Sequence, residues 1–186
     1  MDKFYTMTIA GCKRSLPICK LNDELCIAGF VMFGDPEITT ACAKALLAKA
    51  PEYDYILTAE SKGIPLAHEM CRLDGNRWYV LARKVPKLYM QKVVDVVVKS
   101  ITTEREQHLY LDQADMDKMR GKKILIVDDV VSTGESLKAL EKLTEEAGGI
   151  IVGRMTVLAE GKAADRKDLI YLEKLPLFDK TGKPLD

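Results

Sequence analysis

Two adjacent carboxylates, Asp128 and Asp129, stand between a short apolar run and a segment rich in small hydroxyl side chains. The apolar run, 124–127, predicts a strand buried on both faces, with the carboxylates at the place where it ends. Apolar residues then recur at helical spacing until a Gly-Gly pair, which predicts a helix over 136–147. The order is therefore strand, loop and helix N-terminus.

The loop between this strand and helix, residues 132–136, has the features of an anion site. Unpaired backbone amides at a helix N-terminus converge with the helix dipole on one point. Ser132, Thr133 and Ser136 add hydroxyl donors. The two carboxylates would repel a phosphate, so we expect them to face sugar hydroxyls or a divalent cation. A ribose 5-phosphate has both kinds of group.

Three segments, in order along the chain, are similar to the motifs of one family. The stretch Val-Asp-Asp-Val-Val-Ser-Thr-Gly-Glu-Ser at 127–136 resembles the phosphoribosyl-pyrophosphate (PRPP) motif of the type I phosphoribosyltransferases. Residues 59–63 resemble the pyrophosphate-binding loop of the adenine phosphoribosyltransferases, and residues 82–88 resemble the start of their flexible loop. With a closing Leu-Pro-Leu-Phe, the similarity covers 54–178. It implies an α/β fold, with a Rossmann-like, largely parallel sheet flanked by helices and a small hood.

The resemblance also implies a role for each matching residue. Asp128 and Asp129 are expected to act in catalysis, by binding the ribose hydroxyls or the waters of a Mg²⁺ ion held by the substrate. Glu104 is expected to handle a proton on the base, with Glu106 as the alternative. The other residues are expected to bind the two anionic groups of PRPP: the 5-phosphate by Val131, Ser132, Thr133, Gly134, Glu135 and Ser136, and the pyrophosphate by Ser61, Lys62, Gly63, Arg83, Lys84 and Lys87.

The family reaction is the transfer of the 5-phosphoribosyl group from PRPP to a ring nitrogen of a base, with release of pyrophosphate. The resemblance implies a purine base in nucleotide salvage, adenine first, with hypoxanthine, guanine or xanthine as alternatives. A PRPP-sensing regulator without catalysis is a further alternative, because purine-operon repressors share the motif. Dimers are common in the family, so a homodimer is expected. Phe30, Phe33 and Trp78 could stack on a purine, although core packing is favoured for each.

The charges of the chain balance, since 28 Lys and Arg residues are matched by 28 Asp and Glu residues among 186. A neutral chain gives no reason to expect nucleic acid or a membrane surface as a partner. Charge is nevertheless concentrated locally, because residues 83–92 hold four basic side chains and no acid. A basic segment of this kind suits a small polyanionic substrate.

The elements that position these residues are expected to form one domain, 1–186. Residues 1–53 predict a meander of three strands, at 4–9, 16–21 and 25–31, and a helix that begins after Asp35-Pro36 and ends near Pro51. Residues 54–178 alternate strands with helices, which is typical of a parallel α/β core. The meander and a C-terminal edge strand at 175–178 are expected to form the hood, with a polar tail at 179–186.

Two apolar stretches, 93–98 and 108–111, predict a hairpin that makes a long excursion from the core. The five cysteines and the lack of an apolar leader predict a cytoplasmic protein with reduced thiols. No run of 18 apolar residues is present, so no membrane span is expected. Cys12, Cys19 and Cys26 do not have the spacing of a zinc site, and we expect them to be buried or half-buried on adjacent strands.

Overall fold

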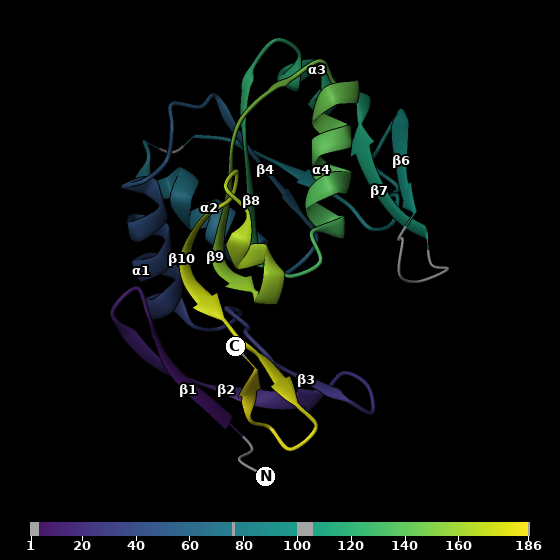
Figure 1. The fold of residues 1–186 in the computed structure, drawn as a ribbon. Helices are drawn as coiled ribbons and strands as arrows, with labels where there is room; N and C mark the ends of the chain where they lie inside the picture. The colour runs from purple at the N-terminus through teal and green to yellow at the C-terminus, as the bar shows by residue number, and fades with distance from the viewer. Residues whose placement is uncertain (1–3, 76, 100–105, 186) are drawn as a thin grey trace.

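The computed structural model of the protein describes residues 4–75, 77–99 and 106–185. These residues form a core built on a parallel sheet and a smaller antiparallel hood, which lies below the core in Figure 1. Glu104, the residue predicted to handle a proton on the base, lies outside the described residues.

The core sheet has five parallel strands in the order β10-β9-β8-β4-β5. Its central strands contain runs of apolar residues that are fully buried, as parallel strands covered on both faces require. The alternation of strands and helices along the chain predicted this sheet, although not its edge strand β10. In chain order the strands are β4 (Tyr55–Ala59), β5 (Tyr79–Ala82), β8 (Lys123–Val131), β9 (Ile150–Glu160) and β10 (Ile170–Leu175).

Helices cover both faces of this sheet (Figure 1). On one face lie α1 (Pro36–Leu47) and α2 (Ile64–Leu73), and Leu46 is fully buried there among strand residues. On the other face lies α4 (Glu135–Glu146), which buries Leu140 completely. Helices α1 and α4 are confirmed where the sequence predicted them, although α1 ends at Leu47 rather than near Pro51.

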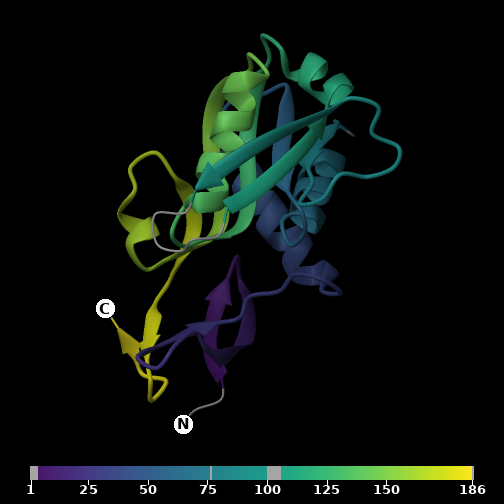
Figure 2. The ribbon, with the colours of Figure 1, turned by 90° about the vertical axis from the view of Figure 1, so that its right-hand side faces the viewer.

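The predicted hairpin is confirmed as strands β6 (Val93–Lys99) and β7 (Glu106–Asp112), which pair antiparallel. Figure 2 shows the hairpin lying across α4, and Leu109 is buried in the cluster that α4 shares with the sheet. The backbones of Arg83 and Tyr110 exchange hydrogen bonds of 2.9 and 2.8 Å. The hairpin is therefore attached to the core sheet just beyond the end of β5.

Two short helices were not predicted. The first is α3 (Gln113–Met119), which follows the hairpin, and the second is a 3₁₀ helix, η1 (Gly161–Asp165), which links β9 to β10. In α3 only Met116 and Met119 mark the buried face. Two apolar positions are too few to reveal a helical period in the sequence.

The hood is an antiparallel sheet in the order β1-β2-β3-β11-β12, so both ends of the described chain build it (Figure 1). Strands β1 (Phe4–Ile9), β2 (Cys12–Lys20) and β3 (Leu25–Ala28) form the predicted meander. Strands β11 (Leu177–Asp179) and β12 (Pro184–Leu185) complete the sheet. The predicted hood of meander and C-terminal edge is confirmed.

The prediction of one edge strand over 175–178 is wrong in detail. Strand β10 ends at Leu175 in the core sheet, and β11 begins at Leu177 in the hood. Pro176 separates the two strands because it has no N–H to donate and restricts the residue before it. The segment predicted as a polar tail, 179–186, is also not a simple tail, since it contains β12.

The central strand β8 is longer than predicted. It continues through Asp128 and Asp129 to Val131, because β9 pairs with it in parallel as far as Val131 and Ala159. This pairing satisfies backbone groups that an early strand end would leave without partners. Asp128 is half-buried and Asp129 is only 3% exposed. The sheet, rather than a loop, therefore holds both carboxylates in place.

The cysteines lie where the meander places them. Cys12 and Cys19 are on β2 and Cys26 is on the adjacent β3, as expected, although Cys19 is exposed. All five cysteines are free thiols. Within the described ranges, no helix has the length and apolar character needed to cross a membrane.

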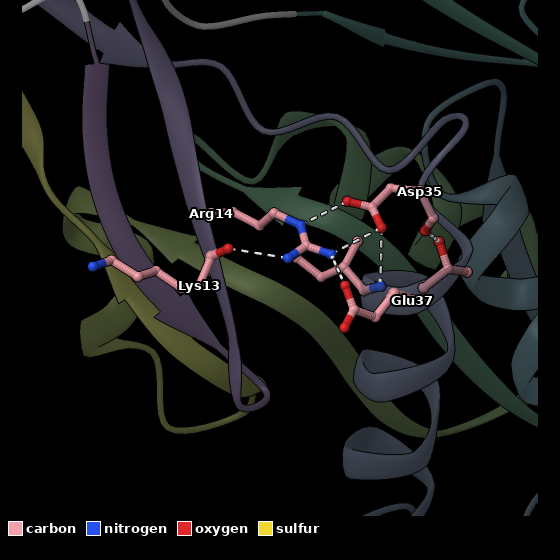
Figure 3. A network of polar contacts seen from close by, with 6 residues as sticks. Lys13, Arg14, Asp35 and Glu37 are labelled. Atoms are coloured by element: carbon pink, nitrogen blue, oxygen red, sulfur yellow. Dashed lines mark hydrogen bonds and ion pairs between the residues drawn. The ribbon is translucent and has the colours of Figure 1, made fainter.

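One polar network joins the hood to the core (Figure 3). Arg14 of β2 donates to the two carboxylate oxygens of Asp35 at 2.7 and 3.0 Å, and to Glu37 at 2.6 Å. Asp35 also accepts from the backbone N–H of Ile38 at 3.2 Å, so the same side chain caps α1. The hydrogen bond from Arg14 lowers the pKa of the Asp35 carboxyl below its ordinary value.

Replacing Asp35 by asparagine is expected to destabilise the protein by about 1 kcal/mol at pH 7, because the charge opposite Arg14 is lost while the helix cap is kept. The pKa of Asp35 is lower in the folded state than in the unfolded chain. Its contribution is therefore present above about pH 4 and is lost as the pH falls through the folded pKa. Urea denaturation of both proteins at pH 7 and pH 3 measures the difference, and an equal difference at both pH values would contradict this account.

Candidate functional site

The carboxyl ends of β4 and β8 meet at one edge of the core sheet, the edge at which parallel α/β folds bind ligands. A cavity of about 750 Å³ opens there. The residues that line it come from all three predicted motifs and from β7: Ala59, Glu60, Ser61, Lys62, Lys84, His108, Leu109, Tyr110, Asp128, Asp129, Val130 and Ser136.

The acidic pair is in direct contact with the predicted pyrophosphate loop. Lys62 Nζ lies 2.9 Å from Asp129 Oδ2, and Asp128 Oδ1 accepts a hydrogen bond of 2.9 Å from the backbone N–H of Asp129. Burial, and then the charge of Asp129, raise the pKa of Asp128 well above its ordinary value. Asp128 therefore keeps its proton to a higher pH than a free aspartate does.

Both helices that follow the strands of the site begin at a glycine. The N-cap residues of α2 and α4 are Gly63 and Gly134, and no side chain caps either helix. The backbone amides of the first turns therefore lack a side-chain acceptor, as an anion site requires. Gly134 has a φ of 79°, a left-handed conformation that glycine adopts without strain. Both helix N-termini without a side-chain cap therefore lie at the loops predicted to bind the two anionic groups of PRPP.

The six residues predicted for the 5-phosphate form the connection from β8 to α4. Val131 is the buried last residue of the strand, and Ser132 and Thr133 are exposed beside the helix cap Gly134. The remaining two, Glu135 and Ser136, open α4, and Ser136 lines the cavity. Their binding roles stay predictions.

The three basic residues predicted to cover the pyrophosphate have different surroundings. Lys84 lines the cavity. Arg83 instead donates to Glu60 at 2.9 Å and to the Tyr89 hydroxyl at 2.7 Å, and it lines a separate cavity of about 390 Å³. Lys87 Nζ lies 3.7 Å from the same Glu60. Burial alone would raise the pKa of Glu60, but the hydrogen bonds from the Lys84 backbone and from Arg83 lower it.

Two charged residues that the sequence did not single out lie beside the predicted phosphate loop. Glu160, the last residue of β9, is 7% exposed. Burial raises its pKa, while a hydrogen bond from Ser132 and the charge of Lys62 oppose that rise. Arg166 Nη1 lies 3.0 Å from the position that a Cβ would take at Gly134. Glu160 could have been predicted as a site residue because it lies at the carboxyl end of a parallel strand, where such folds bind ligands.

Gly63 lets the pyrophosphate loop approach the sheet closely. A Cβ at this position would lie 2.4 Å from Thr58 Oγ1 and 3.2 Å from Asp128 Oδ1. Thr58 is fully buried, and its hydroxyl oxygen has no hydrogen-bond partner among the described residues. The peptide between Glu60 and Ser61 is cis. Because of these two short distances, a residue larger than glycine at position 63 would move either the loop or the acidic strand.

The surroundings of the acidic pair also bear on the expected Mg²⁺ ion. Among the described residues, no three acidic, histidine or cysteine side chains gather into a group that could hold a metal. Asp129 Oδ2 is buried and accepts no hydrogen bond from them, and its partner is the ammonium of Lys62. A carboxylate in this state suits a cation that a substrate brings with it, since Mg²⁺ is commonly held by one or two carboxylates together with phosphate oxygens.

The three aromatic residues considered for stacking differ in burial. Phe30 is buried, as expected for a core residue. Phe33 is 50% exposed and Trp78 is 73% exposed, so the expectation of core packing is wrong for these two. The ammonium of Lys118 lies 5.7 Å from the centre of the Trp78 ring. Phe33 lies in the connection from the hood to α1.

Comparisons with known proteins agree with this geometry. The profile of the phosphoribosyl transferase domain matches residues 36–175. The chain is 31% identical over 133 residues to the hypoxanthine/guanine phosphoribosyltransferase of Ferroglobus placidus, covering 71% of this chain and 67% of that protein. It is 32% identical over 141 residues to the adenine phosphoribosyltransferase of Kosmotoga olearia, covering 74% and 79%.

A solved structure has the same fold. The adenine phosphoribosyltransferase of Rhodothermus marinus superposes with a TM-score of 0.65 and 20% identity, covering 93% of this chain and 94% of that one. The expected type I phosphoribosyltransferase fold is therefore confirmed. The family match spans every residue that lines the cavity. The chain belongs to the phosphoribosyl transferase domain family, and it is an enzyme of the phosphoribosyltransferase class.

Proposed function

We propose that this protein transfers the 5-phosphoribosyl group of PRPP to a purine base, with adenine as the first candidate, and releases pyrophosphate in nucleotide salvage. One observation carries the proposal: the Asp128–Asp129 pair and the loops that begin α2 and α4 meet around one cavity. A sugar with an anionic group on either side is complementary to this arrangement. Relatives named as adenine and hypoxanthine/guanine enzymes support a purine.

In this reaction a ring nitrogen of the base forms a bond to the anomeric carbon of PRPP. The bond from that carbon to the pyrophosphate oxygen breaks, and its electron pair leaves with the pyrophosphate. The protein acts by positioning the reactants and stabilising charge. Ser61, Lys62 and the first amides of α2 hold the pyrophosphate, the loop 132–136 holds the 5-phosphate, and Asp128 and Asp129 hold the ribose hydroxyls.

Pyrophosphate binding changes the partner of Lys62. Without a ligand its ammonium pairs with Asp129, and 46% of its side chain is exposed, so it can turn towards an incoming anion. Asp128 and Asp129 are also the residues that would hold the waters of a substrate-bound Mg²⁺ ion. When bound, the ion supplies positive charge that stabilises the leaving pyrophosphate. The proton on the base remains assigned to Glu104 or Glu106.

The hood is proposed to hold the base. Phe33 is half-exposed in the connection that leaves the hood, and an exposed ring of this kind offers a stacking surface to a planar purine. Trp78 directly precedes β5, the edge strand of the core sheet, and lines the separate 390 Å³ cavity. It is therefore the weaker candidate for stacking on the base.

An assay with a panel of bases tests the proposal. Protein, Mg²⁺ and PRPP are incubated with adenine, hypoxanthine, guanine, xanthine, uracil or orotate, and nucleotide formation is followed by chromatography. We expect product from a purine, with adenine giving the highest kcat/KM, and none from uracil or orotate. If no base gave product while calorimetry still detected PRPP binding, the catalytic proposal would be wrong and a PRPP-sensing regulator would be favoured.

We also propose that the protein is a homodimer. Four exposed apolar side chains flank β5 in the sequence: Trp78 directly precedes the strand, and Val85, Leu88 and Tyr89 lie between β5 and β6. An apolar surface of this kind commonly marks a protein interface. The cytoplasmic location stays a prediction of the sequence.

A further inference from the structure

We propose that His108 of β7 is a direct ligand of the pyrophosphate group, held ready for it by Asp95 of β6. This inference rests on the proposed function, which supplies the pyrophosphate. It assigns a role in pyrophosphate binding to the hairpin. The sequence motifs gave the hairpin only Glu104 or Glu106, which were expected to handle a proton on the base.

His108 lies in the wall of the cavity that also contains predicted pyrophosphate-binding residues. His108 lines the 750 Å³ cavity together with Ser61, Lys62 and Lys84, which are the residues of that lining predicted to bind the pyrophosphate. Those three residues come from the loop after β4 and from the segment after β5. His108 comes from the hairpin, so it extends the set of donors to another wall of the same cavity.

Contacts with Asp95 and Tyr110 fix the orientation of the His108 imidazole ring. Nδ1 of His108 lies 3.1 and 3.0 Å from the two carboxylate oxygens of Asp95. The ring also stacks on Tyr110, with ring centres 6.0 Å apart and planes inclined by 12°. A ring fixed by a carboxylate at one nitrogen presents its other nitrogen, Nε2, in a defined direction. Such fixation reduces the entropy that the side chain loses when it binds a ligand.

The lining of the cavity contains more carboxyl groups than ammonium groups. It includes the carboxylates Glu60, Asp128 and Asp129, against the ammonium groups of Lys62 and Lys84. Lys62 is already paired with Asp129, and the nearby Arg83 is paired with Glu60. A cationic donor on the hairpin wall therefore adds to the two ammonium groups that a pyrophosphate meets in this cavity. In its doubly protonated form His108 donates from Nδ1 to Asp95 and from Nε2 to a pyrophosphate oxygen.

The chain offers a direct test because it contains only two histidines, His68 and His108. His68 lies on α2 and lines a different cavity of about 260 Å³. Inorganic pyrophosphate with Mg²⁺ is titrated into ¹⁵N-labelled protein, and the imidazole nitrogens are followed by NMR. We expect the Nε2 resonance of His108 to shift on saturation while the resonances of His68 stay in place. Pyrophosphate binding that left His108 unshifted would overturn the inference.

Calorimetry on variants provides the second measurement. In H108N the amide nitrogen can take the place of Nδ1 beside Asp95, while the Nε2 donor is removed. We expect the Kd for pyrophosphate with Mg²⁺ to rise about tenfold or more, the effect of losing one charged hydrogen bond. The matched control H68N is expected to bind as the wild type does. An unchanged Kd in H108N would contradict the inference, whereas a wild type that binds no pyrophosphate would contradict the proposed function instead.

Discussion

Replacing Asp129 by asparagine is expected to lower kcat for nucleotide formation by at least about 100-fold, the scale of losing one preorganised charged group at a reacting centre. Asp129 is 3% exposed, it lines the cavity, and its Oδ2 contacts Lys62 at 2.9 Å. The amide keeps the shape of the side chain but removes the charge that holds a ribose hydroxyl or the waters of a substrate-bound cation. Steady-state kinetics with saturating PRPP and base measure the loss.

The fold should survive this substitution. The side chain of Lys62 is 46% exposed, so its ammonium can turn to solvent once its partner is neutral. A thermal melt monitored by circular dichroism checks this point. Asp54, which directly precedes β4, provides a matched control, because it lies at the opposite end of β8 and accepts there from the backbone N–H of Lys123 at 2.8 Å. D54N should retain kcat, and a D129N enzyme with unchanged kcat would show that the acidic pair has been assigned wrongly.

Replacing Gly63 by alanine is expected to lower kcat/KM for PRPP by about 100-fold, since a displacement near 1 Å at a reacting site has an effect of that size. The new Cβ would lie 2.4 Å from Thr58 Oγ1 and 3.2 Å from Asp128 Oδ1. The pyrophosphate loop must therefore move away from β4 and from the acidic strand. Initial rates over a range of PRPP concentrations measure the effect.

A second substitution at Thr58 tests the cause. Thr58 Oγ1 has no hydrogen-bond partner among the described residues, so T58A alone should have little effect. The double variant T58A/G63A removes the atom that the new Cβ meets and should recover much of the lost activity. T58V keeps a group of the same size in that place, so T58V/G63A should not recover. Equal activity of the two double variants would refute the steric explanation.

Local patterns in the sequence were sufficient for most of the core and for the motifs. The helical spacing before the Gly-Gly pair predicted α4, and Asp35-Pro36 predicted the start of α1, because caps and periodicity act over a few residues. Residues 59–63 and 127–136 were expected around one substrate, and both contribute to one cavity. Their chemistry is carried by short continuous segments, which a sequence displays directly.

Features that depend on pairing between distant segments were not predictable in this way. Strand β8 continues beyond Asp128 because β9 pairs with it to its end, and nothing within 124–131 reveals that partner. Arg83 and Lys84 are neighbours in one basic run, yet Glu60 pairs with Arg83 and Lys84 lines the cavity. His108 and Glu160 reach the site from elements whose position only the folded sheet defines.

The division of the C-terminal segment at Pro176 also bears on the order in which the protein folds during synthesis. Cys26 of β3 pairs with Phe178 of β11, so the hood sheet joins residues from near the two ends of the described chain. Closing so long a loop is entropically unfavourable until other contacts have brought its ends together. The core supplies those contacts, because β10 pairs within the core sheet and only Pro176 separates it from β11 in the hood. We therefore expect the meander to be synthesised before the core and yet to pair with β11 only after the core sheet has formed.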